Sequence, residues 1–220
     1  PPSQAVPLVV VNATIVPVAG ETIENGTLIA EGGVVTWLGP AADAPATPAG
    51  STVVNARNRR LYPGLVAANT IMGLMEIGAV RATRDENEVG EVTPEARAIV
   101  AVNPDSTLIP VTRSNGILTA CTLPVGGLVP GRAAVLRLEG WTWEEMAVEA
   151  DAGLCLNWPI LRPIEAWWMD DSPQEQLDRA AGELREIAAL FDRAEAYAAA
   201  RAVDPELPVD VRMEAMLPAI

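Results

Sequence analysis

The stretch LYPGLVAANTIMGL, residues 61–74, decides how the fold is interpreted. Pro63 and Gly64 predict a tight turn, and a nearly continuous apolar run follows from Leu65. A run without alternation between polar and apolar residues is typical of a parallel strand that is buried on both faces. We therefore expect an α/β domain over residues 63–220, preceded by a smaller domain over residues 1–62.

Residues 8–60 predict the smaller domain as a β-sandwich-like unit. The segment LVVVNATIVPV is rich in β-branched residues, which favour strands. Glu31, Gly32 and Gly33 separate two further apolar segments. Because glycine adopts positive φ without strain, these residues predict the turn of a hairpin.

Helices and strands alternate in the sequence after residue 65. Thr93 followed by Pro94 predicts a helix start, and residues 117–123 predict a second buried strand. Residues 127–141 predict a hairpin-like insertion after that strand. A third short strand is expected over residues 152–159.

The clearest helix signal begins at Ser172. Pro173 follows it, and Glu175 lies three residues after Ser172, which together predict a capping box. Apolar residues then recur at helical spacing to about Arg201. Another short helix is expected before the last residue.

Four segments resemble the amidohydrolase superfamily, and its imidazolonepropionase-like members in particular. They are IENGTLIAEGGVVTWLGP, RRLYPGLVAANTIMGLMEIGAVRAT, AVNPDSTLIPVTRSNGILTA and LEGWTWEEM, which cover most of residues 8–150. The resemblance implies a (β/α)8 barrel with a β-sandwich, and metal-dependent hydrolysis of an amide C–N bond. The fold class expected here is α/β, a partial (β/α)8 barrel preceded by the small N-terminal β-sandwich-like unit.

The resemblance places the metal ligands of the family on positions that hold other residues in this chain. The motif's Asp falls on Ala67, and its two His residues fall on Asn69 and Ile71. The whole chain contains no His, and its 15 basic residues are all Arg. We therefore expect vacated metal-ligand positions, no metal, no cofactor, no catalytic residue and no enzyme activity.

The length of the chain predicts an assembly. A (β/α)8 barrel takes about 250 residues, or about 200 at least, and the part of this chain after its N-terminal unit is shorter. Because open sheet edges expose unpaired backbone groups, we expect other protein subunits to cover the open barrel edge. The alternative is the N-terminal part of a split or truncated metal-dependent amidohydrolase.

Five of the six tryptophans lie in two segments that could bind a partner. Tryptophan is enriched at interface anchors, and the neighbouring prolines predict an irregular connector after residue 157. Core filling explains the same residues equally well. The candidate docking residues are Trp141, Trp143, Trp158, Trp167 and Trp168.

Composition excludes some partners. A net charge of −14 disfavours binding to nucleic acid, and no apolar run approaches the roughly 20 residues that span a membrane. The start at Pro1 predicts an exported, periplasmic or otherwise extracytoplasmic protein whose leader was removed before Pro1. Cys121 and Cys155 are interpreted as small buried apolar residues, with a disulfide as the alternative.

These observations favour a non-catalytic, structural role. The leading hypothesis is a pseudoenzyme that acts as an extrinsic scaffold subunit of a larger assembly, such as a membrane-bound photosynthetic or respiratory complex. The truncated amidohydrolase is the first alternative. A small-molecule binding protein, with an apolar pocket near Asn69, Glu76 and Arg81, is the second.

Overall fold

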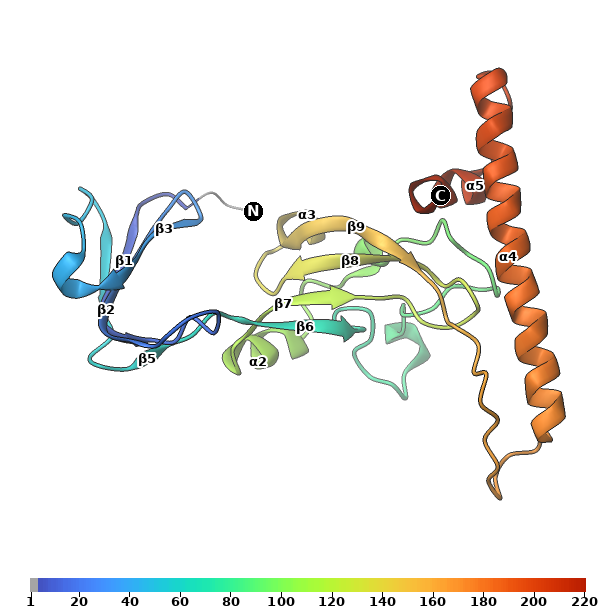
Figure 1. Ribbon diagram of the computed structural model, residues 1–220, viewed down its shortest axis with the longest axis horizontal. Helices are drawn as coiled ribbons and strands as arrows, with labels where there is room; N and C mark the ends of the chain where they lie inside the picture. Colours follow the sequence, from blue (N-terminus) through green and yellow to red (C-terminus); the bar gives the residue numbers. More distant parts are fainter. Residues whose placement is uncertain (1–3) are drawn as a thin grey trace. The chain divides into compact units, whose positions relative to one another are not determined.

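The computed structural model describes residues 4–220 and divides the chain into two compact units. The first unit ends at Leu65, and the second comprises Val66–Ile220. Figure 1 shows that the first unit is built from strands, whereas the second combines a sheet with helices. The chain is therefore a mixed α/β protein with one sheet in each unit.

The first unit contains a single mixed sheet in the order β3-β2-β1-β4. Strand β1 pairs antiparallel with β2 and parallel with β4, and the short strand β5 also runs parallel to β1. The strand bounds are β1 Leu8–Ile15, β2 Ile23–Glu31, β3 Val34–Pro40, β4 Thr52–Asn55 and β5 Arg60–Leu61, with a 3-10 turn η1 over Ala41–Asp43. The predicted strands are present, but one sheet does not confirm a sandwich.

The predicted hairpin turn lies between β2 and β3. Glu31 pairs with Val34, so the loop has two residues, Gly32 and Gly33. Their φ angles are +59° and +82°. Positive φ at both central positions matches the right-handed twist of the two strands, which explains why glycine occupies both positions.

The second unit contains a four-stranded sheet in the order β6-β7-β8-β9. The bounds are β6 Leu65–Thr70, β7 Ile117–Thr122, β8 Gly131–Arg137 and β9 Ala147–Cys155. In Figure 1 the arrows of β6 and β7 run in the same direction, whereas β8 is antiparallel to β7 and to β9. Only the β6–β7 pair therefore has the parallel arrangement of barrel strands, and a longer barrel segment is not confirmed.

Strand β8 differs most from the sequence prediction. It was expected to lie in a hairpin-like insertion, yet it is the most buried strand of this sheet. Gly131–Arg137 consists largely of small and aliphatic residues, which suit a central position between β7 and β9. Residues 127–141 contain only this strand, which pairs with β9 over Ala147–Cys155, so the prediction of a hairpin within 127–141 is wrong.

Helices cover parts of the second unit. The short helices are α1 Ala98–Ala101, α2 Leu108–Ser114, α3 Trp143–Met146 and α5 Val211–Met216, with 3-10 turns η2 Arg81–Thr83 and η3 Leu217–Ala219. The long helix α4 spans Pro173–Val203. Its capping box is confirmed, because Ser172 Oγ accepts from the Glu175 amide while the Ser172 amide donates to Glu175 Oε2 at 2.8 Å.

The predicted helix start at Thr93 is wrong. Helix α1 begins at Ala98, and its N-cap Arg97 makes no side-chain capping bond. The backbone amide of Thr93 donates to the Val129 carbonyl at 2.8 Å, and Thr93 Oγ1 donates to the same oxygen. Thr93 therefore anchors the segment beside residue 129, which leaves it unable to cap a helix.

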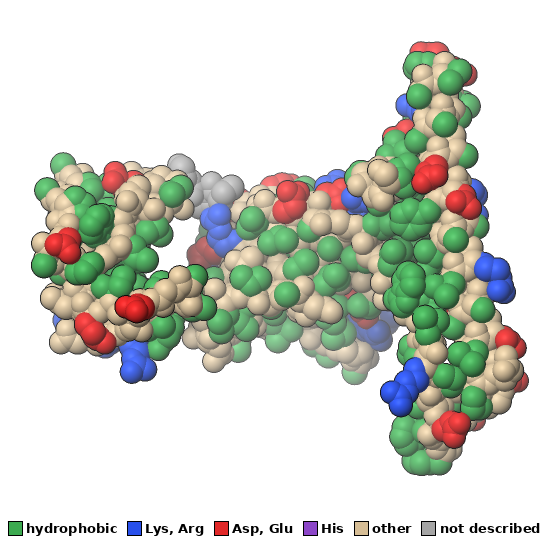
Figure 2. All heavy atoms as spheres, viewed as in Figure 1, with side chains coloured by type: hydrophobic (Ala, Val, Ile, Leu, Met, Phe, Trp, Pro, Cys, Tyr) green, Lys and Arg blue, Asp and Glu red, His purple; other side chains and the backbone are tan. Residues whose placement is uncertain are grey.

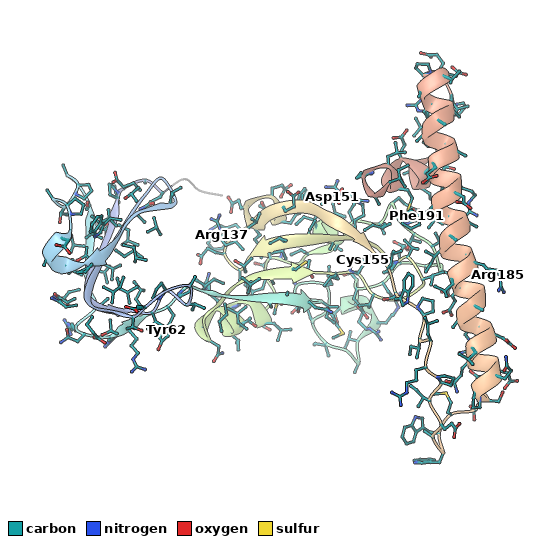
Figure 3. All side chains as sticks on the ribbon, viewed as in Figure 1. Tyr62, Arg137, Asp151, Cys155, Arg185 and Phe191 are labelled. Atoms are coloured by element: carbon teal, nitrogen blue, oxygen red, sulfur yellow. The ribbon has the colours of Figure 1, made fainter. Side chains whose placement is uncertain are left out.

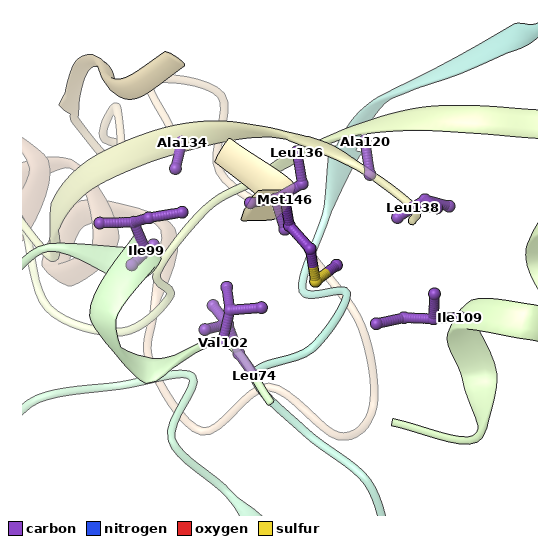
Figure 4. Close-up of a cluster of buried hydrophobic side chains, with 10 residues drawn as sticks. Leu74, Ile99, Val102, Ile109, Ala120, Ala134, Leu136, Leu138 and Met146 are labelled. Carbon is purple, nitrogen blue, oxygen red and sulfur yellow. The ribbon is translucent and has the colours of Figure 1, made fainter. Parts of the chain in front are cut away.

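Two apolar cores hold the second unit together. Figure 4 shows the first, in which Leu136 of β8 and Leu138, just after that strand, lie with Ile99, Ile109 and Met146. The second core joins α4 and α5 to the segment before β8 and contains Leu128, Val129, Ile187, Leu190, Ala194 and Met216. In Figure 3, Phe191 of α4 points toward this core, whereas Arg185 points away from it.

Strand β6 is exposed, contrary to the prediction of a strand buried on both faces. Leu65 and Val66 are 61% and 63% exposed. The reason is the position of β6 at the edge of its sheet, where β7 is its only neighbour among the described strands. The prediction of a strand is confirmed, but residues 4–220 do not supply the elements that would bury it.

Two glycines allow the segment over residues 90–97 to approach the start of β8. A Cβ on Gly131, whose φ is +133°, would lie 2.4 Å from the Ala96 carbonyl oxygen. A Cβ on Gly127 would lie 2.8 Å from the carbonyl oxygens of Gly90 and Glu91. These are contacts with backbone, so any side chain would have to displace one of the two segments.

Replacing Gly131 with alanine tests this close approach. Gly153 is the matched control, because its φ of +145° is similar and nothing lies within 4 Å of a Cβ there. We expect Gly131→Ala to lose about 1–3 kcal/mol more unfolding free energy than Gly153→Ala in urea titrations. Equal losses would contradict the close approach, because backbone strain alone would then explain both.

The capping box generates a second prediction. Hydrogen bonds from the Ser172 side chain and backbone lower the pKa of Glu175 below its ordinary 4.5. We expect Ser172→Ala to lose about 1 kcal/mol of unfolding free energy at neutral pH. Because the folded-state pKa is depressed, the Glu175 contribution is present above pH 4.5 and is lost as the pH falls through the lower folded value.

Urea titrations followed by circular dichroism at neutral pH and at pH 3 measure this effect. Thr107→Ala is the control, because Thr107 occupies the N-cap of α2 without a capping bond. A loss for Thr107→Ala as large as that for Ser172→Ala would show that the capping bonds do not stabilise α4.

Candidate functional site

Of the three residues predicted to occupy vacated metal-ligand positions, Ala67 and Asn69 lie in β6 and Ile71 follows it directly. Ala67 and Ile71 are half-buried and pack against the first core, whereas Asn69 is exposed. Two aliphatic side chains and one neutral amide do not form a zinc site. Among residues 4–220, no group of three or more His, Cys, Asp or Glu side chains could hold a metal ion. The donors of this chain therefore do not fit the metal centre that the resemblance implies.

Glu76 follows β6 and has a structural contact. Its Oε2 accepts a hydrogen bond from Ser106 Oγ at 2.9 Å, and its Oε1 accepts from Asn103 Nδ2 at 3.4 Å. These bonds tie the loop after β6 to the segment before α2. Glu76 therefore holds two loops together at this end of the sheet.

A cavity of about 340 Å³ lies beside the segments that follow β7 and precede β8. Because β6 and β7 are parallel, this is the edge where their carboxyl ends meet, which is the usual place of active sites in barrels. The lining residues are Asp85, Glu86, Asn87, Glu88, Glu95, Ala96, Arg97, Ala98, Val100, Pro124 and Pro130. The cavity is therefore strongly acidic.

Glu86 is the most buried carboxylate of this cavity, with 3% of its surface exposed. Its Oε1 accepts from Arg84 Nε at 2.8 Å and from Arg84 Nη2 at 2.6 Å. Burial acts to raise the pKa of Glu86, but hydrogen bonds from its own backbone and from Arg84, with the charges of Arg84 and Arg81, outweigh it and lower the pKa. Glu86 is therefore ionised at neutral pH.

Residues 84–91 carry most of the charges around this cavity, and no sequence prediction placed a site there. The alternative of an apolar pocket near Asn69, Glu76 and Arg81 named other residues. No local motif brings Glu86 and Glu95 together, because the loop over residues 84–97 has neither helical nor strand spacing. The burial of acidic residues in such a loop cannot be predicted from sequence spacing and is recognised only from the fold.

Four of the five candidate docking tryptophans are exposed. Trp141 and Trp167 are 86% and 93% exposed, and Trp158 and Trp168 are also exposed. The rings of Trp167 and Trp168 meet edge to face, with centroids 5.5 Å apart. Trp143 differs, because it is half-buried and packs against the first core.

Other apolar side chains accompany the tryptophans between β9 and α4. Ile160, Leu161 and Ile164 are exposed in this connector. Figure 2 shows hydrophobic side chains gathered beside the lower part of α4. Docking of a partner at this surface stays a prediction.

Both cysteines are free and half-buried. Burial, followed by the proximity of Cys121, raises the pKa of the Cys155 thiol. The expectation of buried residues is therefore met only in part, because neither thiol is fully buried. Over residues 4–220, no helix combines the length and apolar character needed to cross a membrane.

Comparisons with known proteins support the family resemblance. The crystal structure of an amidohydrolase from Thermotoga maritima superimposes with a TM-score of 0.76 at 21% identity, covering 94% of this chain and 54% of that chain. Amidohydrolase tasK from Hapsidospora irregularis is 28% identical over 100 residues, which are 45% of this chain and 10% of that protein. No family model matches.

These similarities confirm the resemblance to the amidohydrolase superfamily that was predicted from the sequence. The chain has part of the amidohydrolase fold, and it spans about half the length of the Thermotoga protein. The imidazolonepropionase-like subgroup stays a prediction.

The prediction that this chain is not an enzyme is wrong, because the proteins that it resembles in sequence and fold are amidohydrolases. The absent ligands had been interpreted as a loss of activity, although the chain spans only part of its relatives. The place in a photosynthetic or respiratory complex and the periplasmic location stay predictions.

Proposed function

We propose that this chain is one part of a metal-dependent amidohydrolase, and that further polypeptide completes the fold and carries the metal ligands. The observation that carries the proposal is the superposition on the Thermotoga amidohydrolase, in which nearly all of this chain covers about half of the other. The reaction class is hydrolysis of an amide C–N bond in a cyclic or linear substrate.

The open edge of the second sheet supports this proposal. Leu65 and Val66 expose apolar side chains on β6, and Leu118 of the neighbouring strand β7 is 45% exposed. An exposed apolar edge strand is a site where another strand adds, because its backbone donors and acceptors lack partners on that side. A strand of the remaining polypeptide fits this edge.

The metal chemistry then belongs to the remaining polypeptide. Ala67, Asn69 and Ile71 cannot replace histidine ligands, so no step through a metal is assigned to residues of this chain. The part proposed for this chain is the N-terminal portion of the amidohydrolase. It supplies the N-terminal β unit and the sheet that frames one side of the site.

Isolation of the assembled protein tests the proposal. An affinity tag on this chain, placed in its native source, should recover an assembly that contains divalent metal and hydrolyses cyclic or linear amides. The isolated chain should show neither property. Metal content by mass spectrometry and turnover on a panel of hydantoins, dihydropyrimidines and linear amides are the two measurements.

A substitution on the open edge tests whether the additional polypeptide pairs with β6. We expect Val66→Glu to reduce recovery of the assembly and its turnover by about tenfold or more, because a charge would be buried at the new strand pair. Val209→Glu is the matched control, since Val209 is 61% exposed in the loop before α5. An assembly without metal and without turnover would refute the proposed function, and an unaffected Val66→Glu assembly would refute the role of β6.

A further inference from the structure

The connector between β9 and α4 holds large apolar side chains in solvent. Trp158, Ile160, Leu161, Trp167 and Trp168 each expose more than half of their surface. A tryptophan can bury about 150–250 Å² in a contact, whereas monomeric proteins rarely expose apolar patches larger than a few hundred Å². We call these five residues together with Ile164 the connector surface, which lies among the hydrophobic side chains beside α4 in Figure 2.

Hydrogen bonds fix the connector in this exposed position. The Asn157 amide donates to the Leu128 carbonyl at 3.0 Å, and the Asn157 side chain donates to the Gly127 carbonyl at 2.7 Å. Gln176 of α4 accepts from the Ile164 amide at 2.9 Å and donates to the Ile164 carbonyl at 3.0 Å. Because these bonds hold the start and the middle of the connector, its apolar side chains cannot turn inward without breaking them.

Two cavities extend the connector surface along α4. The smaller, of about 200 Å³, is lined by Ile160, Ile164 and Met169 and by one face of α4 that includes Glu183. The larger, of about 370 Å³, is lined by Trp158, Ile160 and Glu183 among others. Ile160 and Glu183 line both, so the two cavities adjoin. The surface is therefore hollowed, and protruding side chains of a partner could enter it.

The larger cavity is acidic as well as apolar. Glu91, Glu183 and Glu186 line it beside Trp158, and no basic residue within residues 4–220 contributes to its lining. A guanidinium group pairs with carboxylates and also stacks on an indole ring. Charge complementarity therefore favours a partner segment that carries an Arg or Lys next to its apolar side chains.

The superposition on the Thermotoga amidohydrolase argues for one occupant. It covers 94% of this chain, which leaves too few residues unmatched to contain the whole connector between β9 and α4. The connector thus belongs at least in part to the shared fold. Nearly half of the Thermotoga chain has no counterpart in this one. Polypeptide of that remaining part is available to cover apolar side chains that this chain fixes in solvent.

We infer that the connector surface is a docking site for the polypeptide that completes the amidohydrolase fold. The docked segment presents apolar side chains to the surface and an Arg or Lys to the acidic cavity beside Trp158. This inference rests on the proposed function, and it adds a contact between side chains to the strand pairing at β6. A second copy of this chain and an anionic membrane are poorer occupants, because a net charge of −14 opposes both contacts.

Hydroxyl-radical footprinting of the tryptophans tests the inference on the isolated chain and on the assembly recovered through the affinity tag. We expect oxidation of Trp158, Trp167 and Trp168 to fall severalfold in the assembly, because their side chains become buried. Trp143 is the control, since it already packs against the first core. Unchanged oxidation of the three tryptophans in an assembly that contains metal and hydrolyses amides would overturn the inference and leave the proposed function in place.

A substitution at the centre of the connector surface provides a second test. Ile160 is exposed and lines both cavities, so Ile160→Glu should leave the isolated chain folded. We expect it to reduce recovery of the assembly about tenfold or more, because its charge would be buried against apolar side chains. Val203→Glu is the matched control, since Val203 is the exposed last residue of α4 and lies outside both cavities. Equal recovery of the two variants would overturn the inference.

Reversal of one charge tests the chemistry of the docked segment. Glu186→Arg should reduce recovery of the assembly severalfold, because it would repel an Arg or Lys in the larger cavity. Glu195→Arg is the control, since Glu195 is an exposed carboxylate of the same helix outside that cavity. Recovery that is the same for the two variants would overturn the assignment of a basic side chain to the cavity.

The isolated chain tests the other occupants. We expect it to sediment as a monomer and not to float with vesicles of phosphatidylcholine and phosphatidylserine. A dimer or a vesicle complex that Ile160→Glu abolishes would overturn the inference, because the surface would then have a different occupant. An assembly without metal and without turnover would instead refute the proposed function, and with it the identity of the docked polypeptide.

Discussion

The close packing of residues 90–97 against residues 127–132 is the constraint on which the second unit depends. Gly127 and Gly131 bring the two backbones within a distance that no side chain would allow. The Arg132 amide then donates to the Ala96 carbonyl at 2.8 Å, and the buried Arg132 side chain bonds Asp151 of β9 and the Ala215 carbonyl of α5. One short segment thereby joins the loop before α1, the central strand, the edge strand and the last helix. The turn that contains Gly127 and Gly131 had no evident role in the sequence, yet it connects these elements of the second unit.

The same junction explains the acidic cavity. Pro130 and Ala96 form part of its lining, so the packing of the two segments places Glu95 beside the loop that carries Glu86. Arg84 bonds one oxygen of Glu86, and Arg212 bonds one oxygen of Glu95. The fold thus gathers the carboxylates of Asp85, Glu86, Glu88 and Glu95 near the carboxyl ends of the parallel strands.

The sequence predicted the features that depend on local chemistry. The capping box at Ser172 and the hairpin glycines Gly32 and Gly33 need only neighbouring residues, and both are present. Thr93 failed as a cap because a partner 36 residues away binds its hydroxyl, and local rules contain no such information. The prediction that β6 is buried was wrong for a related reason. Its apolar residues indicate that the strand is buried in the complete fold, but they do not indicate which polypeptide covers it. Glu86 and Glu95 meet only through tertiary packing, so no spacing in the sequence could have identified them.

The central claim is that further polypeptide completes an amidohydrolase fold on the open edge of β6. An experimental structure of the assembly recovered from the native source tests this claim most directly. The account predicts a strand of the additional polypeptide hydrogen-bonded along Leu65–Thr70 and covering Val66. An assembly in which the edge of β6 remains exposed to solvent would contradict it.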